Sequence, residues 1–262
     1  MPSLVAMGQT TASSSQVASD VAPIVPYNIA SQGTEQPVRW GIDTAWHWSW
    51  WPLRATNHMR ECVSLGRVTI DPRTSGTNTE LTSEQRAGLD EQLSWLKKSG
   101  VTDLYLLSGN TSGTAWQSNY RTAFVRDIVL AVEYLQGKGY RVTVICPFNE
   151  PDYSANNAPS PTEMATVARL LRQDPTLAQI DIAGPSCLNP DYAYAWWETM
   201  KNDLQVGNTH QLAGSFDSFA GFYAAVKASG KKSTGDEMHN INDALIGMNY
   251  GMSEGIWWSD YG

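Results

Sequence analysis

The chain has few cysteines and few basic residues. Its 262 residues include three cysteines, and none of them stands in a Cys-x-x-Cys pattern. They cannot all pair with one another, and we expect Cys146 and Cys187, which fall in neighbouring predicted strands, to be two buried thiols. Lys and Arg total 18 against 26 Asp and Glu, a net charge of −8. A nucleic-acid partner would need a basic stripe, so this balance argues against one and suits a neutral or weakly charged substrate.

Long apolar runs are also missing. No stretch of about 18 or more consecutive apolar residues occurs, so the sequence predicts no membrane span. The first 20 residues lack a basic segment followed by a continuous apolar one, so no standard signal peptide is visible. The cellular location therefore stays open at this point.

The chain is rich in apolar residues. Hydrophobic residues make up 42% of it and include 11 tryptophans, which predicts a sizeable core. Residues 1–36 are rich in Ser, Ala, Thr, Gln and Pro without a sustained period, and we interpret them as a poorly ordered leader or linker. Residues 37–262 are predicted to form one large domain, a length that suits an α/β barrel of about 250 residues.

Strand-like apolar runs recur along this domain, and most are separated by helical patterns. Such alternation is typical of a parallel sheet. Thr82 and Gln85 form a capping-box pattern ahead of one helix, and Ser160 followed by Pro161 marks the start of another. The eight predicted strands lie near residues 41–47, 64–71, 102–108, 141–148, 179–185, 209–214, 233–238 and 253–258.

Eight strands with intervening helices predict a (β/α)8 TIM barrel, although a doubly wound open sheet alternates in the same way. Two features favour the barrel. No glycine-rich phosphate loop follows an early strand, and polar residues cluster at the C-terminal ends of many strands rather than at one crevice. The chain stops at Gly262, directly after the eighth predicted strand, so we expect the final helix of the barrel to be missing from this chain.

Two glutamates lie at the ends of predicted strands. The apolar run 142–148 stops at Asn149-Glu150-Pro151, and the seventh predicted strand contains Glu237. Strands four and seven face each other across a barrel, so their terminal carboxyl groups can approach to about 5–5.5 Å. At that separation one carboxylate attacks a sugar directly, as in a retaining glycoside hydrolase. We interpret Glu150 as the acid/base, Glu237 as the nucleophile and Asn149 as a donor to the sugar 2-hydroxyl, because a neighbouring anion helps an acid to keep its proton.

The segments Phe148-Asn149-Glu150-Pro151 and Gly235-Asp236-Glu237 resemble the fourth- and seventh-strand signatures of glycoside hydrolase clan A. Members of that clan are (β/α)8 barrels that hydrolyse β-linked saccharides, usually with retention. The resemblance implies a carbohydrate substrate, a β-glycan, with no cofactor and no metal. Within the clan, Asn-Glu-Pro-Asp-Tyr at 149–153 and the Trp-rich first strand most resemble the agarase and porphyranase group. Such a function would favour a secreted or periplasmic location.

The same resemblance implies roles for further residues. Arg67 is similar to a strand-two arginine that braces the nucleophile, and His210 to a strand-six histidine near it. Trp257 or Trp258 is similar to the strand-eight tryptophan that forms the floor of the −1 subsite. One departure from the clan pattern is that no strand-six tyrosine follows His210, and Tyr223 lies too far into the next helix to replace it.

Aromatic residues gather near the first and third strands. Sugar C–H faces stack on such rings. Core packing is the alternative for any single tryptophan, and we expect at least one of Trp196 and Trp197 to be core. His47 and Asp43 in the same predicted loop are candidates to bind sugar hydroxyls. The tryptophans predicted to contact a saccharide are Trp46, Trp48, Trp50 and Trp51 after strand one and Trp116 after strand three.

Two other classes of function remain open. A metal-dependent barrel isomerase or hydrolase would use carboxylates and histidines at strand ends as ligands. A non-catalytic carbohydrate-binding barrel would use the aromatic residues alone. The strand-end residues that could ligate a metal are Glu150, Asp152, His210, Glu237, His239 and Asp260.

Overall fold

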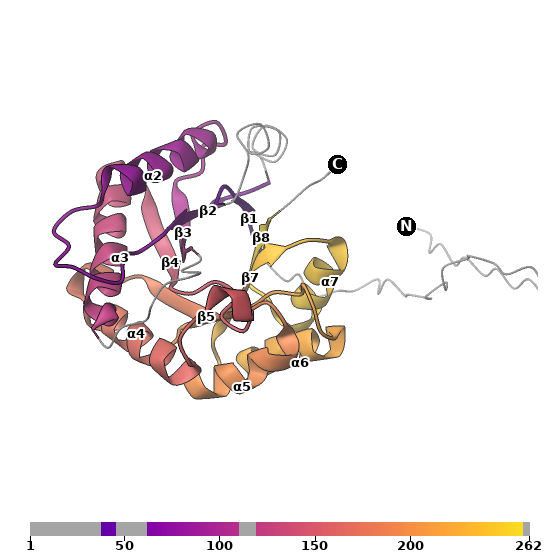
Figure 1. The fold of residues 1–262 in the computed structure, drawn as a ribbon. Coiled ribbons are helices and arrows are strands. Elements are labelled where there is room, and N and C mark those ends of the chain that lie inside the picture. The colour runs from indigo at the N-terminus through magenta and orange to yellow at the C-terminus, as the bar shows by residue number, and fades with distance from the viewer. Residues whose placement is uncertain (1–37, 46–61, 110–118, 259–262) are drawn as a thin grey trace, which may run out of the picture. The chain divides into compact units, whose positions relative to one another are not determined.

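The computed structural model describes residues 38–45, 62–109 and 119–258. In this part of the chain eight parallel strands pair in sequence order and close into a barrel through β1 and β8 (Figure 1). The (β/α)8 prediction is therefore confirmed, and a doubly wound open sheet is excluded. The strands are β1 Arg39–Asp43, β2 Leu65–Ile70, β3 Asp103–Ser108, β4 Arg141–Cys146, β5 Asp181–Cys187, β6 Val206–Thr209, β7 Lys232–Met238 and β8 Glu254–Trp257.

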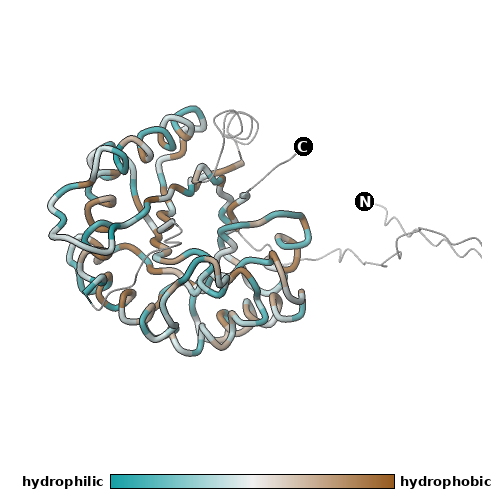
Figure 2. Tube along the Cα trace, in the orientation of Figure 1, coloured by the Kyte–Doolittle hydropathy of each residue, from teal (hydrophilic) through white to brown (hydrophobic). Residues whose placement is uncertain are grey.

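From β2 to β8, a helix lies between each strand and the next and covers the outside of the barrel (Figure 1). Thr82 caps the first of them in a capping box with Gln85, and Ser160 caps another that has Pro161 in its first turn, as predicted. Teal and brown alternate along the helices in Figure 2, as expected for helices with one face on the sheet. The helices are α2 Ser83–Leu96, α3 Tyr120–Gly137, α4 Pro161–Gln173, α5 Pro190–Met200, α6 Phe216–Ala228 and α7 Ile241–Tyr250, with 3-10 turns η1 Ser154–Asn156 and η2 Pro175–Leu177.

The sixth strand lies earlier than the predicted 209–214. Val206 pairs with Ala183 of β5, and the strand ends at Thr209. Leu212, which falls inside the predicted range, is 40% exposed in the loop that follows. The prediction failed because register with β5, rather than local hydrophobicity, determines which residues pair.

Side chains alternate between the barrel interior and the layer under the helices. The interior holds a small apolar cluster: Leu65, Tyr105, Leu107, Val144, Cys146, Ala183, Val206 and Ile256. Two residues further along their strands, on the same interior side, stand the polar Arg67 and Asn208, both fully buried. Parallel pairing of Asp43 with Arg67 continues this polar layer into β1. The alternation thus places an apolar plug in the barrel with a charged layer above it, at the C-terminal ends of the strands.

Two predictions about the core are confirmed. Cys146 and Cys187 are buried free thiols. Trp197 is fully buried, and Trp196 packs partly buried against the same core cluster.

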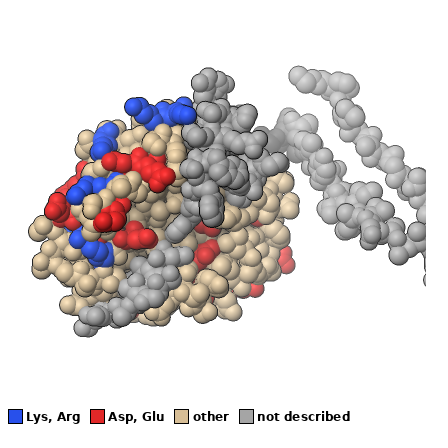
Figure 3. All heavy atoms as spheres, turned by 45° about the horizontal axis from the view of Figure 1, so that its top comes forward, with Lys and Arg blue, Asp and Glu red and all other residues tan. Residues whose placement is uncertain are grey.

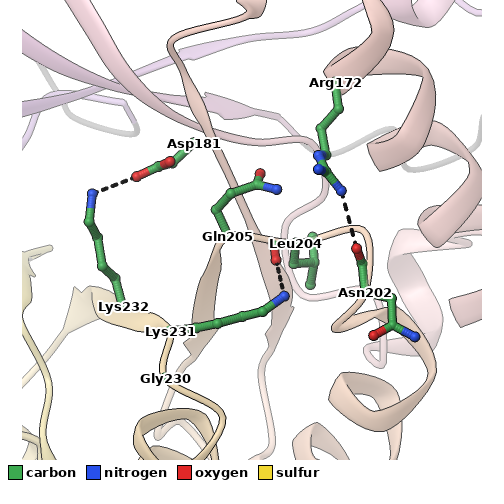
Figure 4. Close-up of a pocket in the computed structure, with 8 residues that line it drawn as sticks. All are labelled: Arg172, Asp181, Asn202, Leu204, Gln205, Gly230, Lys231 and Lys232. Atoms are coloured by element: carbon green, nitrogen blue, oxygen red, sulfur yellow. Dashed lines mark hydrogen bonds and ion pairs between the residues drawn. The ribbon is translucent and has the colours of Figure 1, made fainter.

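A cavity of about 360 Å³ lies at the opposite, N-terminal ends of β5, β6 and β7 (Figure 4). Lys231 donates there to the carbonyl oxygens of Lys201 and Leu204, just after α5. A cation at the C-terminal end of a helix is favoured by the helix dipole. Lys232 pairs with Asp181 at 2.7 Å, so basic side chains here bind groups of the protein itself. We interpret these contacts as tying the end of α5 to β7.

The described surface carries mixed charge. On the face seen in Figure 3, acidic and basic side chains are interspersed, without a continuous basic stripe in the part that is coloured. Across the described residues, no helix combines the length and the apolar character that crossing a membrane requires.

Candidate active site

Glu150 occupies a sharp turn after β4. Its φ of 44° lies in the left-handed region, which costs a residue other than glycine about 1–3 kcal/mol and is common at functional sites. The turn is held in place on both sides. The Glu150 amide donates to Ser186 O at 2.9 Å, and its carbonyl accepts from Asn156 Nδ2 at 3.0 Å. The side chain is 12% exposed at the C-terminal end of the barrel.

Glu237 reaches the same end of the barrel from β7. Its side chain is 6% exposed, and Oε2 lies 3.0 Å from Arg67 Nη1. Burial alone would raise the pKa of Glu237, but the positive charges of His210 and Arg67 outweigh it and hold the pKa below its ordinary value. Glu237 is therefore an anion at neutral pH, which is the state a nucleophile needs.

The two glutamates and one histidine form a compact group. One carboxylate oxygen each of Glu150 and Glu237 and one ring nitrogen of His210 all lie within 4.8 Å of one another. The Nδ1 atom of His210 lies 3.1 Å from Glu150 Oε1. The structure thus brings together the two carboxylates that the sequence placed on opposite strands.

Arg67 is fully buried and binds carboxylates on two sides. Its Nε and Nη2 donate to both oxygens of Asp43, at 2.9 and 2.8 Å. Burial would lower the pKa of Arg67, but Asp43 and Glu237 raise it well above its ordinary value, so the guanidinium stays charged. Asp43 thus differs from the expectation of a loop residue exposed to sugar. It lies in β1 with a fully buried side chain that fixes Arg67.

The sequence reasoning missed Asp236. Neighbouring residues of a strand normally point to opposite faces, so Asp236 and Glu237 should not share one side. The β7–β8 register shifts between Gly235 and Met238. At this irregularity both carboxylates turn to the same cluster, and Asp236 Oδ1 lies 2.9 Å from His210 Nε2. The only sequence signal was the position of an aspartate next to the candidate nucleophile.

The two candidate tryptophans of β8 lie in different surroundings. Trp257 stacks on Trp40, with ring centroids 5.7 Å apart, and packs against the core layer outside the barrel. It is therefore poorly placed for a subsite floor. The ring of Trp258 lies 4.6 Å from that of His239. His239 Nε2 in turn is 3.7 Å from Glu237 Oε1, so Trp258 is the tryptophan beside the carboxylates.

Asn149 precedes Glu150 and is 6% exposed. Its Oδ1 has no hydrogen-bond partner among the residues that the structure describes. Tyr223 contributes nothing to Glu237, because its hydroxyl donates to Thr234 O at 3.0 Å. The remaining candidates, Trp46, His47 and Trp116, lie outside the described residues, together with Trp48, Trp50, Trp51 and Asp260.

The residues that might ligate a metal fit one poorly. Both oxygens of Asp152 accept backbone amides, from Leu188 at 2.7 Å and Asn189 at 2.9 Å. Both ring nitrogens of His210 face carboxylates, and these raise its pKa well above the ordinary value despite the opposing effect of burial. A histidine protonated on both nitrogens has no lone pair for a metal.

Comparisons with solved structures show a shared fold. A GH30 endoxylanase from Clostridium papyrosolvens C71 is 16% identical with a TM-score of 0.63, and the match covers 87% of this chain and 66% of that one. A GH26 endo-β-1,4-mannanase catalytic domain from Bacillus sp. JAMB-750 is 11% identical with a TM-score of 0.57, covering 87% and 78%. A mandelate racemase/muconate lactonizing enzyme from Roseiflexus sp. is 11% identical with a TM-score of 0.50, covering 84% and 55%.

No protein-family model and no curated protein sequence matches the chain. The chain spans about two thirds of the length of the endoxylanase. Its resemblance to clan A glycoside hydrolases is confirmed at the level of the fold. The narrower resemblance to agarases and porphyranases finds no support in these comparisons. Since a racemase shares the fold as well, the function has to be argued from the site.

Proposed function

We propose that the chain is a retaining glycoside hydrolase that acts on a β-linked saccharide through Glu150 and Glu237. The observation that carries this proposal is the approach of the two carboxylates, with one oxygen from each within 4.8 Å. Retaining enzymes hold their carboxyl groups about 5–5.5 Å apart, whereas inverting enzymes leave about 6.5–9.5 Å for a water. The proximity therefore supports direct attack by a carboxylate.

In the first step Glu237 attacks the anomeric carbon from below the ring. Glu150 gives its proton to the leaving oxygen, whose bond to the anomeric carbon breaks. The product is a glycosyl ester on Glu237 with inverted configuration. Arg67, 3.0 Å from Glu237 Oε2, orients the attacking carboxylate.

In the second step Glu150, now a carboxylate, takes a proton from water. The oxygen of that water attacks the anomeric carbon as its proton moves to Glu150. The bond from the anomeric carbon to Glu237 breaks, so the configuration is restored. Asn149 donates to the sugar 2-hydroxyl, and its unpartnered Oδ1 offers an acceptor to the same sugar. Trp258 gives the ring a stacking surface beside His239, and Trp46, His47 and Trp116 are proposed to extend the binding site.

A metal-dependent reaction is less well supported, because His210 would have to lose a proton before it could ligate. Full activity in the presence of a chelator is the expected result. A purely carbohydrate-binding barrel would not require Glu237 to be held as an anion next to a second carboxylate.

The test is a screen of the full chain on xylan, β-mannan, laminarin, mixed-linkage β-glucan and agarose, with the first-formed product anomer followed by NMR. We expect a β-anomer product from at least one of them. Glu150→Gln should slow turnover about 10²- to 10⁴-fold while leaving binding of the same glycan nearly unchanged. Binding of a glycan without turnover by the unaltered chain, or an α-anomer as the first product, contradicts the proposal.

A further inference from the structure

His210 lies between the two glutamates, directly after β6. Its Nδ1 is 3.1 Å from Glu150 Oε1 and 3.9 Å from Glu237 Oε2. Its Nε2 lies 2.9 Å from Asp236 Oδ1 and 3.2 Å from Ser186 Oγ. The oxygens of Glu150 and Asp236 can both accept hydrogen bonds from this ring only if both ring nitrogens donate, which is what an imidazolium does.

Asp236 contacts the Nε2 side of this ring. Its side chain is fully buried, and a buried carboxylate needs a charged partner to stay ionised. Burial would raise its pKa, but His210 and then Arg67 lower it to about 2, so Asp236 is an anion throughout the range in which enzymes work. The Arg67 Nη1 atom lies 3.7 Å from Asp236 Oδ2.

We propose that Asp236 is a positioning residue that keeps His210 as an imidazolium, and that this cation counters the charge of Glu237 in the resting enzyme and of Glu150 in the glycosyl-enzyme. The second half of the proposal rests on the double displacement described above. Its basis is geometric, because one ring nitrogen lies within 4 Å of an oxygen of each glutamate while the other nitrogen stays on Asp236.

The charges balance through both steps. Besides Glu150, the cluster holds two cations and three carboxylates: Arg67, His210, Asp43, Asp236 and Glu237. The proposed first step needs a proton on Glu150; with that proton on Oε2, Oε1 still accepts from His210 Nδ1, and the resting sum is 2 − 3 = −1. When Glu237 becomes a neutral ester, Glu150 has given its proton to the leaving oxygen and is the new anion, so the sum stays −1. The negative charge moves from one side of His210 Nδ1 to the other, and the imidazolium itself keeps both protons.

Two other titratable groups near Asp236 keep their protons at neutral pH. Burial raises the pKa of Cys146 on β4 to about 12 and that of Tyr105 on β3 well above its ordinary value. Asp152, in the turn after β4, binds two backbone amides. His239 lies on the far side of Glu237, so its signals must be separated from those of His210.

The test compares the full chain with Asp236→Asn, which removes the charge and keeps an oxygen that can accept from His210. Ring ¹⁵N and N–H signals are recorded by NMR on histidine-labelled protein and assigned by their loss in His210→Gln. In the unaltered chain both ring protons of His210 should persist well above pH 6.5, the ordinary pKa of a histidine. In Asp236→Asn one proton should be lost at a pH at least about one unit lower, the equivalent of a tenfold change in the ring's proton affinity.

Activity gives the second readout. Relative to the unaltered chain, kcat/KM of Asp236→Asn on an aryl β-glycoside of the sugar found in the screen should fall, and the deficit should grow as the pH rises through the range in which its His210 loses the proton. The matched control is Asp127→Asn, which neutralises a fully buried carboxylate on α3 that binds Arg73 and Asn78, neither of which belongs to the charged cluster. It should lower stability and leave the pH profile unchanged.

A His210 that is neutral at pH 7 in the unaltered chain overturns the proposal, and this measurement needs no variant to fold. An unchanged His210 titration in Asp236→Asn overturns it as well. If the titration follows the prediction but the unaltered chain hydrolyses no glycoside, the claim that Asp236 keeps His210 as an imidazolium is supported. The glycosidase function and the claim about the glycosyl-enzyme then both fail.

Discussion

Single residues of the site combine full burial with full charge. Arg67, Asp236 and His210 have fully buried side chains, yet each lies beside at least one oppositely charged group. Removing one member of such a buried pair leaves an uncompensated charge and typically costs about 3–5 kcal/mol. We infer that the site is held by charges that compensate one another, so its stability should depend on pH.

The sign of that dependence follows from the pKa shifts. The pKa of Asp236 falls from 3.8 to about 2 on folding, because His210 and Arg67 outweigh burial. Its contribution is present above the unfolded value and is lost as the pH falls from about 4 towards 2. The pKa of His210 is raised above 6.5, so its contribution is complete below that pH and is lost as the pH rises through the folded value.

Denaturant titrations of the full chain from about pH 2.5 to 9 check this. We expect the unfolding free energy to fall at both ends, and Asp236→Asn to lose much of the slope on the acid side. A one-unit shift corresponds to about 1.4 kcal/mol, which such titrations resolve. Equal acid-side slopes in the two proteins would show that Asp236 is not ionised by its partners in the fold.

Strands and helices set the accuracy with which these residues are placed. A side chain on Gly207 of β6 would point at α6, because an added Cβ would lie 2.3 Å from Val226 Cγ2. Val226 is fully buried and β-branched, so it cannot move aside easily. The glycine therefore sets how closely α6 approaches the strand that leads to His210.

Gly207→Ala should destabilise the chain by about 1–3 kcal/mol through overpacking. The comparison is Gly88→Ala in α2, where an added Cβ meets no atom within 4 Å. Alanine is the better helix former there, so this variant should gain about 0.5–1 kcal/mol. Urea unfolding measures both changes, and a Gly207→Ala variant as stable as the unaltered chain would refute the packing argument.

The sequence was informative about elements and less so about contacts between them. Helix starts such as Ser160-Pro161 depend on local chemistry, which a sequence displays directly. The position of β6 depends on register with a strand remote in sequence. The arrival of Asp236 beside Glu237 depends on a strand irregularity that no local pattern indicated. The approach of His210 to Glu150 is likewise a property of the closed barrel.

At the scale of the whole barrel, closure is what assembles the site. Pairing of β1 with β8 removes both sheet edges and fixes the strands at one circumference. Arg67 and Glu237 are 170 residues apart in sequence and 3.0 Å apart in space as a result. Carboxylates from β4 and β7 meet over the apolar plug for the same reason. The central claim is that these two carboxylates have different, complementary roles.

Azide trapping tests that claim most directly. Glu237→Gly and Glu150→Gly are each given an aryl β-glycoside of the sugar found in the screen, with azide, and the glycosyl azide is analysed by NMR. Azide in the space vacated by Glu237 attacks from the nucleophile's side, so Glu237→Gly should give the α-azide. Azide in the space vacated by Glu150 attacks the glycosyl-enzyme, so Glu150→Gly should give the β-azide. The reverse assignment, or no azide product from either variant, would contradict the account.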